Sequence, residues 1–225
     1  MNPVLKSVLA APILAIALLS SGAPAVAAAK PAVKPAQAPV SKATEAPVPV
    51  IDRFHDALIT MMKKGPELGF QGRVKFITPI ADQTFDYKDM TQRAVGPGWS
   101  QMSPQDQAKL IAAFRKFSIY TYAHQFRSYD GEHFELVGDP QTGKLGGVLV
   151  RTRIVPNGDD PVSLNYLLHQ ASGWKIYDVY LAGTISEVAR RREDFSTILR
   201  EKGPAGMVVA LDEKSAAIEA EDAKS

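Results

Sequence analysis

Residues 162–183 read VSLNYLLHQASGWKIYDVYLAG, and this stretch decides the fold. Apolar side chains recur at every second position in its first half, which is the side-chain period of a β-strand. Ser172-Gly173 interrupts the pattern, and a second strand-like run follows it. Two such runs joined by a short turn predict an antiparallel hairpin. We therefore place an antiparallel sheet at the centre of the domain.

Strand-like and helix-like runs on either side of this hairpin complete the plan. Residues 133–138 and 147–155 have the composition of two more strands, each ended by a turn rich in Gly, Pro, Asp or Asn. Apolar spacings of three and four predict helices over 51–64, 72–84, 86–95, 103–127, 185–203 and 206–218. This order predicts an α+β fold, in which a four-stranded curved antiparallel sheet packs with several helices around an apolar pocket. Both faces of the strand over 174–183 are rather apolar, which a cavity and a second helical layer explain equally well.

The two ends of the chain are predicted to lie outside the domain. Residues 1–29 combine a positive charge, an apolar run and the A-x-A sequence of residues 25–27, as a secretory signal peptide does. The alternative is a retained membrane anchor, for which the apolar run is short. Residues 30–50 are rich in Pro and Ala and predict an extended linker. A single domain is then expected over 51–217, followed by a flexible tail over 218–225.

Composition and one near-motif narrow the function classes. The chain has no cysteine, which excludes disulfides, reactive thiols and thiolate metal sites. The formal net charge is +2, and about +1 without the predicted signal peptide, so no nucleic-acid partner is indicated. Residues 138–145, GDPQTGKL, approach the phosphate-binding pattern G-x-x-x-x-G-K-[ST]. However, Leu145 replaces the metal-binding hydroxyl, and a strand follows where a helix is needed. A hairpin is predicted there instead of a nucleotide site.

No catalytic constellation is evident. The serine-hydrolase pattern G-x-S-x-G and the metalloprotease pattern H-E-x-x-H are absent. The histidines are not spaced as metal ligands, and we expect surface or boundary positions for all of them: His55, His124, His133 and His169. We therefore predict a protein that is not an enzyme and has no cofactor and no metal.

Charged residues in two places require a partner or exposure. Asp178 lies in an apolar strand, so an ion pair with Arg151 or Arg153 is the expected arrangement. An envelope enzyme that uses Asp178 or a histidine is the least favoured alternative. Residues 190–192 are three consecutive arginines that spread over most of a helical turn, which indicates a solvated face. The alternative for them is a docking patch for an acidic partner or for lipid headgroups.

Two segments carry a pattern of positions that is more specific than any single motif. The first runs through Phe85-Asp86, Met90, Ala94-Val95-Gly96, Trp99, Tyr122, Tyr129, Gly131 and Glu132, and the second through Trp174, Ile176, Asp178 and Val179. Their order and spacing resemble the MlaC (toluene-tolerance) family of periplasmic lipid-binding proteins, over about residues 51–211. Within that family, Pro97-Gly98 and the run 184–187 are most similar to HpnM, the hopanoid-associated branch.

The resemblance implies a monomeric carrier in the periplasm with a role in outer-membrane maintenance and lipid transport. It would move a hopanoid or a phospholipid between an inner-membrane lipid transporter and an outer-membrane acceptor complex. Such a carrier needs no catalytic residues, because covering the hydrocarbon avoids an exposure cost of about 0.8 kcal/mol per CH₂.

Residue type, strand phase and helix spacing supply the candidate lipid-binding residues: Trp99, Phe114, Phe117, Tyr120, Tyr122, Val150, Leu164, Tyr166, Tyr177, Val179 and Leu181. The family pattern supports Trp99, Tyr122 and Val179 as positions. The alternative is a non-catalytic interaction or structural module of the envelope, in which the same aromatic residues form a solid core.

Overall fold

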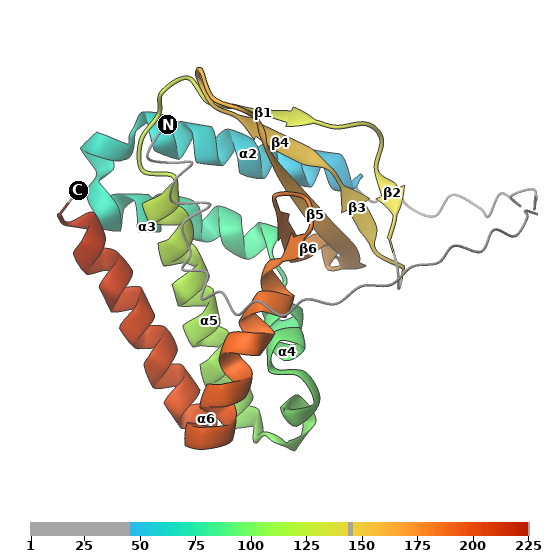
Figure 1. The fold of residues 1–225 in the computed structure, drawn as a ribbon, viewed down its shortest axis with the longest axis vertical. Coiled ribbons are helices and arrows are strands. Elements are labelled where there is room, and N and C mark those ends of the chain that lie inside the picture. Colours follow the sequence, from blue (N-terminus) through green and yellow to red (C-terminus); the bar gives the residue numbers. More distant parts are fainter. Residues whose placement is uncertain (1–45, 144–145, 225) are drawn as a thin grey trace, which may run out of the picture.

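The computed structural model describes residues 46–143 and 146–224 (Figure 1). The predicted signal peptide and most of the predicted linker lie outside these residues, as do Lys144 and Leu145 of the 138–145 pattern. The elements, in chain order, are α2 (Pro47–Lys63), α3 (Gly65–Thr84), α4 (Tyr87–Val95), the 3₁₀ helix η1 (Gly96–Gln101), α5 (Pro104–Gln125), β1 (His133–Leu136), β2 (Gln141–Thr142), β3 (Val148–Val150), β4 (Thr152–Val155), β5 (Val162–Ala171), β6 (Gly173–Leu181), β7 (Ile185–Ser186) and α6 (Glu187–Asp222). The predicted α+β class is confirmed.

The sheet is antiparallel and has seven strands where four were expected. Its order is β1-β4-β5-β3-β2, and β6 pairs with the other side of β5 and with β7. The predicted hairpin of β5 and β6 is confirmed. The run 147–155 divides into β3 and β4 because the Asn165 side chain accepts a hydrogen bond from the Thr152 N–H (3.2 Å), which breaks the regular ladder there. The two shortest strands, β2 and β7, have two residues each and carry no periodic signal.

The helix starts follow the predicted cap residues. Asp86 accepts a hydrogen bond from the Asp89 N–H (2.9 Å) at the start of α4. Ser103 accepts one from the Asp106 N–H (3.1 Å) at the start of α5, with Pro104 in the first turn. These side chains satisfy N–H groups that have no partner inside the helix, so the caps set where each helix begins.

Two helices begin earlier than their apolar pattern indicated. Helix α2 begins at Pro47 and not at Ile51, and Val50, which was assigned to the linker, is buried in the core. Pro47 is favourable there because a proline in the first helical turn removes an N–H that would otherwise lack a partner. Helix α3 begins at Gly65 and not at residue 72, with a break at Gly69, whose φ of 59° interrupts the helical pattern.

Helix α6 contains both predicted C-terminal helices, separated by the expected break at Gly203-Pro204, and it also includes the start of the predicted flexible tail. Its two arms meet at Gly203, with φ 64°, followed by Pro204. The second arm continues to Asp222, so the tail predicted from residue 218 is helical at least to that residue. The physical reason is an ion pair that the sequence pattern cannot reveal: the Asp222 carboxylate accepts two hydrogen bonds from the buried guanidinium of Arg73.

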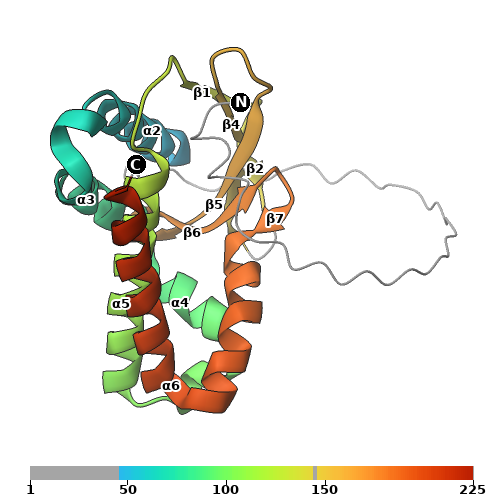
Figure 2. The same cartoon turned by 60° about the vertical axis from the view of Figure 1, so that its left-hand side comes forward.

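The helices cover one face of the sheet and extend beyond it. Helices α2 and α3 lie against the sheet, while α5 and the two arms of α6 run away from it, with α4 between α5 and the first arm (Figures 1 and 2). A continuous apolar core of buried residues connects the sheet to the α-helices. Within the described parts of the chain, no helix has the length and apolar character required to cross a membrane.

Candidate functional site

An apolar cavity lies between the inner face of the sheet and helices α4, α5 and α6. Its volume is about 100 Å³, and we call it the inner cavity. The strands contribute Ile154, Val162, Leu164, Val179 and Leu181 to its lining. The helices and the segment before α4 contribute Phe85, Tyr87, Met90, Phe114, Phe117, Ser118, Thr121, Tyr122, Gln125, Phe126, Glu187, Val188, Arg190 and Arg191. The wall is mostly aromatic and aliphatic, and its charged members all come from the first arm of α6.

Two polar side chains of α5 present little hydrogen-bonding capacity to the inner cavity. The Ser118 hydroxyl donates to the Phe114 carbonyl (2.9 Å), and the Thr121 hydroxyl donates to the Phe117 carbonyl (2.8 Å). Hydroxyls bonded back to their own helix no longer need to donate to a ligand. This part of the wall is therefore suited to hydrocarbon.

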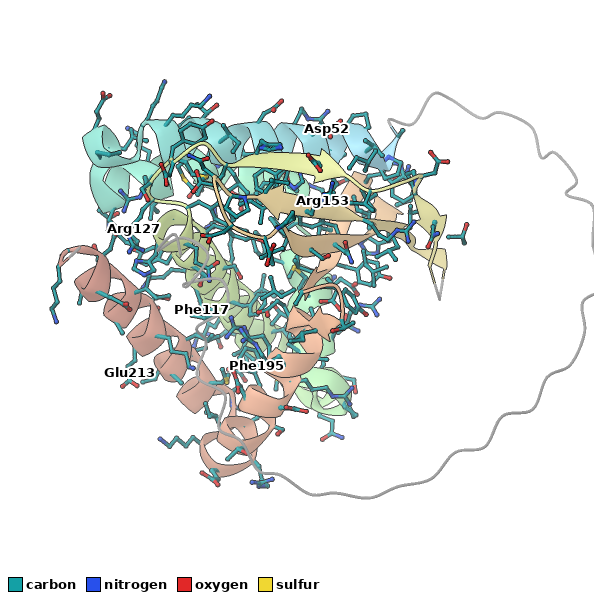
Figure 3. The ribbon with its side chains drawn as sticks, turned by 45° about the horizontal axis from the view of Figure 1, so that its top comes forward. Asp52, Phe117, Arg127, Arg153, Phe195 and Glu213 are labelled. Carbon is teal, nitrogen blue, oxygen red and sulfur yellow. The ribbon has the colours of Figure 1, made fainter. Side chains whose placement is uncertain are left out.

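The structure brings together about half of the predicted lipid-binding residues around this cavity: Phe114, Phe117, Tyr122, Leu164, Val179 and Leu181. Phe117 of α5 and Phe195 of α6 point into the interior between their helices (Figure 3). The remaining predicted residues lie elsewhere: Trp99, Tyr120, Val150, Tyr166 and Tyr177.

Val150 and Tyr166 lie in the solid part of the core. Val150, Tyr166 and Val179 are consecutive cross-strand neighbours on one face of the sheet, but only Val179 reaches the inner cavity. The Tyr166 hydroxyl instead forms a hydrogen bond with His55 Nε2 of α2 (2.9 Å). Period-two alternation assigns a residue to a face of the sheet, but it does not reveal which helix covers that residue.

Tyr177 lies on the opposite face of the sheet because β6 contains a β-bulge. Leu168 pairs with Ile176 and Leu167 pairs with Asp178, so Tyr177 is an extra residue between them. The bulge places Ile176 and Val179 on the inner face, although they are three positions apart, and turns Tyr177 outward. The ring of Tyr177 lies instead under the Arg93 guanidinium, 4.5 Å from its Cζ.

Trp99 and Tyr120 are separated from the inner cavity by the geometry of their helices. Trp99 is buried in η1, where its carbonyl accepts a hydrogen bond from the Gln107 side chain (2.9 Å). Tyr120 packs edge-on against Phe70, with ring centroids 5.0 Å apart. The residues Phe114, Phe117 and Tyr120 are three positions apart, which is less than the 3.6 residues of a helical turn. Each is therefore rotated around the helix relative to the one before it, and Tyr120 no longer faces the cavity.

The wall of the inner cavity carries charged side chains that the predicted site lacked. Glu187 Oε2 lies 3.0 Å from Arg190 Nη2 and 3.5 Å from Arg191 Nη2. The Arg191 guanidinium lies over the Phe117 ring, 4.6 Å from its centroid, and burial lowers the pKa of Arg191. The solvated face expected for residues 190–192 is therefore wrong for Arg191, whose side chain is 15% exposed, whereas the Arg190 side chain is 33% exposed. Arg192, by contrast, points to the other side of α6, against Gly96.

Asp178 holds the first arm of α6 against the sheet and is not paired with an arginine of β3 or β4. Its carboxylate accepts hydrogen bonds from the Ser186 hydroxyl (2.6 Å), the Val179 N–H (2.8 Å) and the Val188 N–H (3.1 Å). Arg153 instead pairs with Glu135 at 2.6 Å. Burial raises the pKa of Asp178, although these hydrogen bonds oppose the shift. The carboxylate is occupied structurally, which leaves it poorly placed to act as an acid–base group.

Two histidines are buried, contrary to the surface or boundary positions expected for all four. His55 stacks on Phe134, with centroids 3.8 Å apart, and desolvation lowers its pKa to about 3. His124 is also buried, and desolvation is again the main cause of its lowered pKa. Among the residues that the structure describes, no group of three or more His, Asp or Glu is placed to hold a metal ion.

A second hollow, the outer groove, lies on the opposite face of the sheet. Its volume is larger, at about 980 Å³. However, its wall includes charged and amide groups, from Asp89, Arg93, Asn165 and Arg192. Hydrocarbon placed there would leave these polar groups without water, at a cost of several kcal/mol in order of magnitude. The smaller inner cavity is therefore the better site for an apolar ligand.

Comparisons with known proteins agree with this architecture. The family model described as MlaC protein matches residues 52–213. A solved structure of a phospholipid-binding protein from Ralstonia solanacearum, in complex with a phospholipid, has a similar fold with a TM-score of 0.67 and 24% sequence identity. The match covers 76% of this chain and 97% of that one. No curated protein matches. With its family model covering most of the domain, this chain belongs to the MlaC family.

Proposed function

We propose that this protein is a non-catalytic lipid carrier that holds the acyl chains of a phospholipid in the inner cavity. The observation that carries the proposal is the apolar space between β5, β6 and α5 in a chain of the MlaC family. The similar Ralstonia solanacearum protein is described in complex with a phospholipid, which supports the same ligand class here.

The cellular role follows from the cost of moving a lipid through water. Exposing an acyl chain to water costs about 0.8 kcal/mol of free energy per CH₂. A carrier that covers about ten methylenes therefore avoids a cost of about 8 kcal/mol. We place this carrier in the periplasm, exported by the predicted signal peptide, and we assign it transfer between an inner-membrane transporter and an outer-membrane acceptor. The family of the chain supports this assignment.

The inner cavity must widen when a lipid enters. Its volume of about 100 Å³ is below the roughly 150 Å³ of an apolar cavity that binds benzene. An acyl chain therefore enters only when the helices that line the cavity move away from the sheet. The break in α6 at Gly203 lies between the arm that lines the cavity and the arm that Asp222 anchors, so it is placed to absorb this movement.

One buried donor belongs to a residue that lines the inner cavity, and it favours a glycerolipid. Among the described residues, the Tyr87 hydroxyl has no hydrogen-bond partner, although it is buried in the cavity wall. A buried donor without a partner costs about 1–3 kcal/mol. The ester carbonyl of a glycerolipid is an acceptor of the right chemistry to relieve that cost.

A variant with a carboxylate in the cavity wall tests this function. The mature protein would be purified from its own periplasm without detergent and measured by native mass spectrometry, followed by extraction of bound lipid. We expect wild type to carry phospholipid and Leu164→Glu to lose it, because the new carboxylate would face the acyl chains. Val209→Glu is the matched control, because Val209 is 55% exposed on the second arm of α6.

The outcomes separate the candidate cargoes and the rival function. Equal lipid occupancy in Leu164→Glu and Val209→Glu would refute the cavity assignment. A hopanoid mass would identify the cargo indicated by the HpnM-like residues 97–98 and 184–187. Wild type that is free of lipid and takes up none from vesicles would support the interaction module with a solid core.

A further inference from the structure

Two arginines in the wall of the inner cavity outnumber the carboxylate in the same wall. Glu187, Arg190 and Arg191 lie three and four residues apart, so they share one side of the first arm of α6. Glu187 is the only carboxylate among the residues that line the described cavity. Among the lining residues, arginines therefore outnumber carboxylates by one, while Asp194, outside the lining, lies 3.9 Å from Arg191.

Both guanidiniums keep hydrogen-bonding capacity that the described residues do not use. Arg190 Nη2 binds Glu187, but the buried Arg190 Nε has no partner among the described residues. The carboxylate oxygens nearest to Arg191 lie at 3.5 Å in Glu187 and 3.9 Å in Asp194, beyond the usual range of about 2.7–3.2 Å for an N–H···O bond. A guanidinium has five N–H donors, so both side chains keep donors that a ligand could use.

The surroundings hold the Arg191 side chain in place. Its side chain is only 15% exposed, and its guanidinium lies over the Phe117 ring that forms part of the cavity wall. A planar guanidinium fixed on an aromatic face keeps its donors in a set orientation. The Arg191 guanidinium therefore adjoins the apolar surface that would contact the chains.

We propose that Arg190 and Arg191 bind the phosphate of an anionic phospholipid headgroup while the acyl chains of that lipid occupy the inner cavity. This inference rests on the proposed function and names the lipid class. Two arginines can donate several charge-assisted hydrogen bonds to one phosphate, which a ligand without phosphate cannot accept. A zwitterionic ethanolamine headgroup brings its own cation close to the two arginines, so it should bind less well than an uncharged glycerol headgroup on the same phosphate.

The three consecutive arginines offer a matched control. Arg192 has the same charge and the same helix but faces the outer groove. Delipidated wild type, Arg191→Gln, Arg190→Gln and Arg192→Gln would each be equilibrated with vesicles of phosphatidylglycerol, phosphatidylethanolamine or diacylglycerol in a phosphatidylcholine background. Bound lipid would be quantified after the vesicles are removed.

We expect wild type to prefer phosphatidylglycerol to phosphatidylethanolamine, and Arg191→Gln to lower phosphatidylglycerol retention about tenfold, the effect of losing one charged hydrogen bond. Arg190→Gln should act in the same direction. Diacylglycerol retention should not change in either variant. Unchanged retention would also show that each variant folds and still binds acyl chains. Arg192→Gln should behave as wild type.

Several results would overturn the proposal. Equal losses in Arg191→Gln and Arg192→Gln would indicate a general charge effect and no subsite. Retention of all lipids without a headgroup preference would remove the phosphate subsite but leave the carrier function, whereas no retention of any lipid would remove both. The last measurement is the binding of inorganic phosphate alone. If phosphate binding depends on Arg191, and a phospholipid with acyl chains binds no more strongly than phosphate, the arginines form a site for free anions instead.

Discussion

Filling the inner cavity with a side chain should stabilise the empty protein and weaken its hold on lipid. Val179→Phe makes this change, because Val179 lines the cavity. Val150→Phe is a matched control. Both valines are cross-strand neighbours of Tyr166 on the same face of the sheet, but Val150 is fully buried in the solid core.

The cavity volume sets the size of the expected effect. Removing core volume destabilises a protein by about 24 cal/mol per Å³ of cavity, so filling all of the roughly 100 Å³ would gain at most about 2.4 kcal/mol. A phenyl ring in place of an isopropyl group fills only part of that space, so we expect Val179→Phe to gain about 1 kcal/mol. Val150→Phe has no space to fill and should lose about 1–3 kcal/mol through overpacking.

Urea unfolding of the delipidated proteins measures both changes in the free energy of unfolding. Lipid content after incubation with vesicles should fall in Val179→Phe, because the ring occupies the position of the chains. A Val179→Phe variant that is destabilised as much as Val150→Phe would show that the wall is as densely packed as the core. The cavity in the lipid-free protein would then be refuted.

Two further changes test the packing that surrounds the site. His55→Gln should flatten the pH dependence of stability. The folded-state pKa of His55 is lowered to about 3, so its contribution is complete above the usual pKa of 6.5 and is lost as pH falls toward 3. Between pH 7.5 and pH 5, wild type should lose about 2 kcal/mol more than the variant in urea unfolding, and parallel profiles would contradict this. Asp222→Asn leaves the buried Arg73 without its counter-ion and should cost about 3 kcal/mol. A thermal unfolding midpoint equal to that of wild type would mean that the end of α6 contributes nothing.

The fold followed from the sequence where local chemistry determined it. The hairpin of β5 and β6 and the caps at Asp86 and Ser103 depend on neighbouring residues, so pattern and residue type were enough to predict them. The end of α6 depends on Arg73, which lies 149 positions from Asp222 in the sequence. No local pattern carries such a contact, and the tail was therefore mispredicted.

The site was predictable only to the level of the face on which a residue lies. Leu164 and Val179 were found because alternation places them on the helix-covered side. Tyr177 was misassigned because the bulge changes the phase of β6 without any glycine or proline to mark it. Arg190 and Arg191 could have been found by noticing that Glu187 precedes them by three and four positions, which places all three on one side of a helix.

The bulge in β6 also has a consequence for how the chain can vary in length. Tyr177 is the extra residue, since Ile176 and Asp178 pair with the adjacent residues Leu168 and Leu167. A chain without Tyr177 would have regular alternation, with Ile176 and Val179 still facing inward and Asp178 still facing α6. Homologous chains can therefore lose or gain one residue at this point without reversing either half of the strand, and an alignment of the family should place a single-residue gap there.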